Sequence, residues 1–63
     1  MASNKLTPEQ KMEMWHNGER KQNVAACSDT KLERYYRICV ERHYVSEAAQ
    51  LAREMQRRGI AVR

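Results

Sequence analysis

Large apolar side chains are scarce in this chain of 63 residues, which has no phenylalanine, one tryptophan, one proline, two glycines and two cysteines. A domain of this length buries only about 60% of the surface that its unfolded chain exposes, so its core is marginal. Walls for a deep substrate pocket are therefore hard to build. The two isolated glycines also exclude a glycine-rich phosphate-binding loop. We expect a single domain, residues 1–63, that is not an enzyme and needs no cofactor.

Long apolar runs are missing as well. No stretch approaches the roughly 20 residues that a membrane-spanning helix needs, and the first residues lack the pattern of a secretory signal. Without such a signal, two cysteines are typical of free thiols in a reducing compartment. The sequence therefore predicts a cytoplasmic protein that does not enter a membrane.

The charge is basic but mixed, with 12 Lys and Arg against 8 Asp and Glu and a net charge of +4. Residues 53–63 hold four arginines and one glutamate. Such a surface suits nucleic acid or an acidic protein surface as a partner, and it requires neither.

Capping residues locate the first helix. Thr7 precedes Pro8, and Gln10 follows three residues after Thr7, which is the pattern of a capping box with proline at the first helical position. Asn17 and Gly18 form a good left-handed stop. We predict a helix over residues 8–17, preceded by a short disordered arm, residues 1–6.

The second helix is predicted over residues 30–44, with a cap among Ser28, Asp29 and Thr30. Its apolar residues recur at the spacing that places them on one broad stripe of a helix. They are Leu32, Tyr35, Tyr36, Cys39, Val40 and His43. This helix is expected to carry most of the core.

The third helix is predicted over residues 47–58, with Ser46 as its cap. Gly59 follows the last helical residue, and Ile60 can contact Met55, as in a Schellman motif. The inward face is expected to be Ala48, Leu51, Ala52 and Met55. The short link from Tyr44 to Ser46 makes the second and third helices neighbours.

These elements predict an all-α fold, a compact three-helix bundle. Residues 19–27 are ambiguous, because neither the helical nor the strand period is clear there, and a short fourth helix, a strand and a loop all fit. A homodimer that pools two small cores is plausible on the same grounds.

One set of residues has a spacing that can bind zinc. Cys39 and His43 lie at i and i+4, and His16 and Cys27 could complete four ligands. His16 and Cys27 lack the close spacing that organises structural zinc sites. The apolar stripe already explains the positions of Cys39 and His43. We therefore expect no metal.

A protein interface is predicted from the residues that the stripe leaves outside. Ile38 lies off the middle of the stripe, Met14 points away from the face of the first helix, and Tyr44 lies at the edge. Apolar residues among Arg34 and Arg42 have the composition of an interface core. The prediction is that this surface binds a protein partner or a second copy.

The alternative to a protein interface is a helix-turn-helix DNA-binding unit, in which the helix over 47–58 lies in a groove of the DNA. Its outward residues for contacts to bases and phosphates are Gln50, Arg53, Arg57 and Arg58. Val45 in the turn would resist a positive φ, and Glu47 and Glu54 beside the stripe would repel phosphate. A solvated helix face is favoured over DNA contact.

The chain as a whole resembles the short early-region proteins of lambda-like bacteriophages, encoded between the recombination and excision genes. The similarity lies in size, in Leu6 to Gln10, in the helix with Leu32 to Tyr36 and in the helix with Ser46 to Ala49. The resemblance implies a small regulator in the host cytoplasm, made early in infection, that affects the lysis–lysogeny choice or the host cell cycle by binding a host or phage protein. It transfers no site residues.

Overall fold

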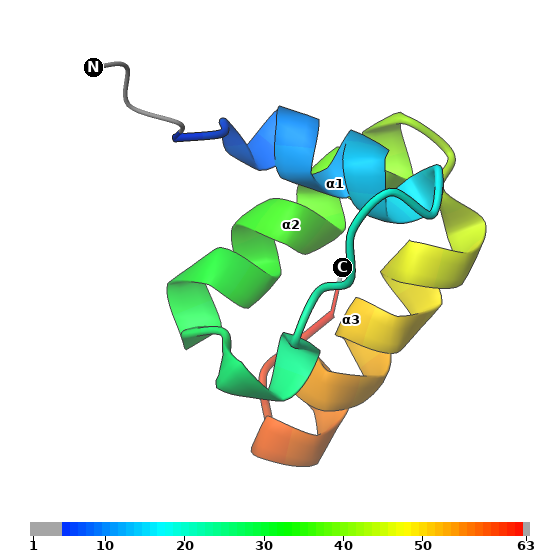
Figure 1. Ribbon diagram of the computed structural model, residues 1–63. Coiled ribbons are helices and arrows are strands. Elements are labelled where there is room, and N and C mark those ends of the chain that lie inside the picture. Colours follow the sequence, from blue (N-terminus) through cyan, green and yellow to red (C-terminus); the bar gives the residue numbers. More distant parts are fainter. Residues whose placement is uncertain (1–4, 63) are drawn as a thin grey trace.

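Three α-helices and one short 3₁₀ turn make up the part of the chain that the structure, a computed structural model, describes: residues 5–62. The elements are α1 (Pro8–His16), η1 (Val24–Ala26), α2 (Asp29–Glu41) and α3 (Val45–Arg58). Figure 1 shows α1 lying across the pair formed by α2 and α3. The predicted all-α three-helix bundle is confirmed. No helix within residues 5–62 combines the length and apolar character needed to cross a bilayer.

The helix starts follow the predicted caps at two of three places. The Thr7 hydroxyl accepts from the Gln10 N–H and the Gln10 side chain accepts from the Thr7 N–H, so the capping box is present. The Ser28 hydroxyl caps α2 by accepting from the Lys31 N–H at 3.2 Å. The prediction for α3 was wrong: the helix begins two residues earlier, at Val45, with Tyr44 at the N-cap and no side-chain cap.

All three helices end in the same way. A residue with positive φ lies one or two positions after the last residue of each helix, and the residue after it donates its N–H to a carbonyl five positions back, which is a Schellman closure. The φ values are 80° at Gly18, 62° at His43 and 82° at Gly59. The closing bonds run from Glu19 to Met14 (2.8 Å), from Tyr44 to Cys39 (2.8 Å) and from Ile60 to Met55 (2.8 Å). The left-handed His43 ends α2 at Glu41, earlier than the predicted residue 44.

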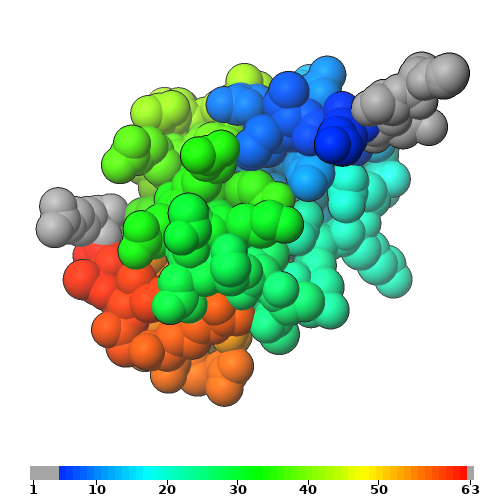
Figure 2. Space-filling view, turned by 90° about the vertical axis from the view of Figure 1, so that its left-hand side faces the viewer, coloured from blue at the N-terminus to red at the C-terminus, as the bar shows by residue number. Residues whose placement is uncertain are grey.

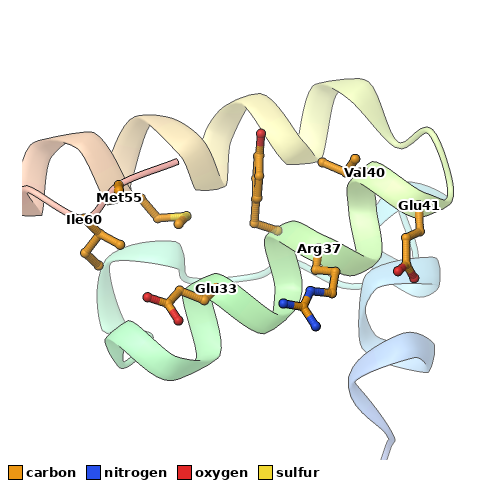
Figure 3. Close-up of a pocket in the computed structure, with 8 residues that line it drawn as sticks. Glu33, Arg37, Val40, Glu41, Met55 and Ile60 are labelled. Carbon is orange, nitrogen blue, oxygen red and sulfur yellow. The ribbon is translucent and has the colours of Figure 1, made fainter. Parts of the chain in front are cut away.

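The helices α2 and α3 form an antiparallel hairpin. The three-residue turn Arg42–Tyr44 joins the end of α2 to the start of α3. At the other end, Arg58 Nη1 donates to Asp29 Oδ1 at 2.9 Å, so the last residue of α3 is fixed to the first residue of α2. The two helices therefore lie side by side over their whole length, as Figures 1 and 3 show.

The core lies between this hairpin and α1. Its buried residues are Met12, Cys27, Leu32, Tyr35, Ile38, Cys39, Leu51 and Met55. The predicted stripe on α2 is therefore displaced: Ile38 is buried, whereas Val40 is 46% exposed and His43 is exposed. The reason is the position of α1, whose first residues Pro8 and Glu9 line the same hollow as Ile38 on that flank of α2.

The ambiguous segment 19–27 is an irregular stretch with a single 3₁₀ turn, η1, which packs against α3. Its Cys27 is buried, and the Cys27 thiol donates to the Asn23 carbonyl at 3.5 Å. Figure 2 shows this segment on one side of the molecule and the C-terminal residues on the other. Of the predicted arm, residues 1–4 lie outside the described part of the chain.

Candidate protein-binding face

One face of the α2–α3 hairpin, opposite α1, has an open apolar groove near the turn. The groove has a volume of about 400 Å³. It is lined by Tyr36, Cys39, Val40, His43, Val45, Ala48, Ala49 and Ala52. Val45, at the start of α3, is 75% exposed, and among residues 5–62 it is the more exposed of the two large apolar side chains that lie in solvent. Apolar side chains of this size that gather around an open groove are typical of a surface that binds another chain.

A second hollow, of about 750 Å³, continues the same face toward the C-terminus. Tyr36 and Val40 line both hollows, so the two form one continuous surface. Figure 3 shows Val40 at one end of the second hollow, and Met55 and Ile60 at the other. We call the residues that line the two hollows the hairpin face.

The two edges of the hairpin face differ in charge. The α2 edge carries Glu33, Arg37 and Glu41, which follow one another every four residues and lie in a row in Figure 3. The α3 side contributes only apolar residues to the two hollows. Arg53, which is exposed, lies one step further outward on α3. The α2 edge is therefore net acidic, and the α3 edge is basic.

The residues predicted as a protein interface differ in their exposure. Ile38, the proposed centre, is only 7% exposed and belongs to the core, so that expectation was wrong. Tyr44 and Met14 are half-buried, whereas Arg34 and Arg42 are exposed. The error has a physical cause: α1 covers the flank of α2 that bears Ile38 and leaves the opposite flank open.

The arginines predicted to contact nucleic acid differ in availability. Arg58 donates to Glu54 Oε2 (2.8 Å), Asp29 Oδ1 (2.9 Å) and the Ala25 carbonyl (2.9 Å), so its guanidinium joins α3 to α2 and η1. Arg57 donates twice to Glu54, at 3.1 and 2.8 Å. Hydrogen bonds from both guanidinium groups lower the pKa of Glu54 to about 2.

The surroundings of the outward stripe of α3 nevertheless differ from the expectation. Neither carboxylate beside the stripe is unpaired: Glu54 is bound by Arg57 and Arg58, and Glu47, which is 7% exposed, lies against His16. The positive φ that the turn needs falls on His43, so Val45 is not strained. The expected strain at Val45 is therefore absent, whereas Glu54 still occupies Arg57, one of the residues predicted to contact nucleic acid.

A polar contact joins α1 to the start of α3. His16 Nδ1 lies 3.0 Å from Glu47 Oε1, and the His16 ring stacks on Tyr44 with centroids 4.1 Å apart and planes 9° from parallel.

Burial, together with the negative charge of Glu47, raises the pKa of the Cys39 thiol to about 12. This thiol is therefore neutral and lacks nucleophilic character at neutral pH.

The zinc spacing is not realised as a cluster. Cys39 is fully buried, whereas His43 is exposed in the turn beyond the end of α2. Among residues 5–62, no three His, Cys, Asp or Glu side chains lie together in an arrangement that could hold a metal ion.

The sequence pattern does not predict the hairpin face, because it places Val40 in the core and Val45 in a turn. A usable signal did exist in the sequence. Val45, Ala49, Ala52 and Gln56 recur at i, i+4, i+7 and i+11, an uncharged row on an otherwise charged helix.

Comparisons with protein-family models, with curated proteins and with solved structures found no match for this chain.

Proposed function

We propose that this chain is a small non-enzymatic regulatory protein that acts by binding another polypeptide through the hairpin face. The observation that carries the proposal is the exposure of Val40 (46%) and Val45 (75%) beside small residues of α3 on an open groove. In a protein with so small a core, leaving two valines in water forfeits burial energy, and a partner would recover it.

The cellular setting belongs to the same proposal. The resemblance in size and helix pattern to the early-region proteins of lambda-like phages supports a regulator that acts early in infection in the host cytoplasm. The free state of Cys27 and Cys39 supports a reducing compartment. On this proposal the partner is a host or phage protein.

Site-specific photo-crosslinking in bacterial cells tests the binding face. A photoreactive amino acid at position 45 should link to a polypeptide, and the same amino acid at Gln50, on the outward side of α3, should not. Adding Ala49→Arg to the first variant should abolish the product, whereas Gln50→Arg, which adds the same charge one residue away, should leave it. Equal products from positions 45 and 50, insensitive to Ala49→Arg, would refute the proposal.

DNA binding through the outward stripe of α3 is the second candidate. It is supported by the pairing of Glu47 with His16 and of Glu54 with Arg57 and Arg58, which offsets the negative charge beside Gln50 and Arg53. The antiparallel hairpin disfavours it, because helix-turn-helix units cross at about 90–120°. Titration of duplex DNA with labelled protein at low and moderate salt separates the two candidates: Arg53→Ala should weaken DNA binding and leave the crosslink at position 45 intact.

A further inference from the structure

We propose that the hairpin face binds a second copy of this chain, giving a two-fold dimer whose centre is a four-helix bundle of two α2–α3 hairpins. This inference rests on the proposed function, since it names the occupant of the same face. It replaces the predicted dimer contact through Ile38, which the fold buries.

The size of the face fits such a dimer. With 13 and 14 residues, α2 and α3 are each about 20 Å long, and packed helices lie about 8–10 Å apart. The hairpin therefore presents a face about 20 Å square once side chains are included. A specific dimer buries about 800 Å² on each partner, and this would be about one sixth of the 4671 Å² that the chain exposes. In flat projection the hairpin face covers about 400 Å², half of that area, and the relief of its side chains adds to it, so the dimer lies at the small, weak end of specific interfaces.

The shape of the face fits a helix from another copy. Ala48, Ala49 and Ala52 leave α3 with low relief along the groove, while Val40 and Val45 project beside it. A facing helix can approach closely over alanines, and projecting valines then fill the space between the helices. The face thus contains both the ridge and the groove that self-association needs.

The charges fix the arrangement of the two copies. A two-fold axis parallel to the helices lays α2 of one copy over α3 of the other. The acidic α2 edge then meets the basic α3 edge of the second copy, whereas an axis across the helices would place the two acidic edges together.

The level of the contacts follows from the ion pair that closes the hairpin. Because Arg58 is bound to Asp29, those two residues lie at the same height. Arg53 lies five residues before Arg58 on α3, and Glu33 lies four residues after Asp29 on α2. Both are therefore slightly more than one helical turn from the ion pair, at about the same height. An axis parallel to the helices preserves height, so Glu33 of one copy faces Arg53 of the partner subunit at the rim, twice in the dimer.

Sedimentation equilibrium of the full chain, from micromolar to roughly millimolar concentration, tests the dimer. The wild-type mass should rise from monomer to dimer with concentration. Ala49→Arg should raise the dissociation constant about tenfold or more, because it places a charge within the contact. Gln50→Arg, the matched control on the outward side, should leave it unchanged. Circular dichroism of each variant confirms that the helices are intact.

A charge exchange tests the arrangement independently of folding. Glu33→Arg and Arg53→Glu should each weaken the dimer, and the double variant should recover it, because the pair is restored with reversed signs. A double variant as weak as the singles, or a wild-type chain that stays monomeric throughout, would overturn the inference. If the chain is monomeric but position 45 still crosslinks to a different polypeptide, the dimer falls and the proposed function stands. If Ala49→Arg affects neither assay, both fall.

Discussion

Replacing His43 by glycine should stabilise this protein, although it removes a side chain. His43 lies in the turn between α2 and α3 with φ 62°, the only non-glycine residue among those described with a positive φ. Its N–H donates to the Val40 carbonyl at 3.2 Å, and the N–H of Tyr44 closes the motif on Cys39. Glycine adopts this conformation freely because it has no Cβ, whereas the Cβ of any other residue causes a steric penalty.

The magnitude follows from two opposing contributions. The left-handed conformation costs an L-residue about 1–2 kcal/mol, whereas glycine loses about 0.5–1 kcal/mol more conformational entropy than another residue on folding. The difference favours His43→Gly by roughly 0.5–1 kcal/mol. For a domain of this size, that gain raises the melting temperature by about 4–8 °C.

Thermal unfolding followed by far-ultraviolet circular dichroism measures the change. Gly59→Ala is the matched control: Gly59 has φ 82° in the equivalent position after α3, and a Cβ there meets no atom within 4 Å. Its substitution is therefore purely conformational and should destabilise by about 1 kcal/mol. If Gly59→Ala lowers the melting temperature while His43→Gly leaves it unchanged or lower, the conformational reasoning at His43 is refuted.

Three further predictions concern ionisable groups. Because the folded pKa of Glu54 is lowered to about 2, its ion pairs stabilise the protein above the unfolded pKa of about 4.5. That stability should be lost as the pH falls from about 4.5 to 2, and urea titrations should show a smaller loss in Glu54→Gln. A double-mutant cycle with His16→Ala and Glu47→Ala should give a coupling of about 1 kcal/mol, because Glu47 is buried against His16; additive effects would contradict the contact. In Cys27→Ser, the remaining thiol of Cys39 should react with a thiol reagent at the rate of unfolding, and fast labelling of the folded protein would show that Cys39 is accessible.

Local signals in the sequence determined the ends of the helices where side chains act on their own backbone. The capping box at Thr7 and the Schellman closure at Gly59 are short-range hydrogen-bond patterns, so residues 7–10 and 55–60 were sufficient to predict them. The end of α2 could not be predicted from such local patterns. A histidine in the left-handed region carries no sequence signal, so the sequence predicts a helix that continues through residue 44 and a next helix capped by Ser46.

The choice of buried flank could not be predicted from α2 alone. Ile38 and Val40 lie on opposite sides of the Leu32–Cys39 row, and each is apolar. Which one is buried depends on where α1 packs, and that is a tertiary contact between residues about thirty positions apart in the sequence. The predicted protein interface was centred on Ile38 and was wrong for the same reason, because α1 covers that flank of α2.

The energetics of the two faces of α3 favour the hairpin face as the binding surface. On the outward stripe, Arg58 is committed to α2 and η1, and Arg57 would have to leave Glu54 to contact a phosphate. Two phosphate contacts would give a salt slope of only about −1.8, which corresponds to weak binding. On the hairpin face, burial of Val40 and Val45 breaks none of the ion pairs found among the described residues. Binding there should therefore be nearly independent of salt apart from the rim charges, so the salt dependence of association distinguishes the two surfaces before any partner is identified.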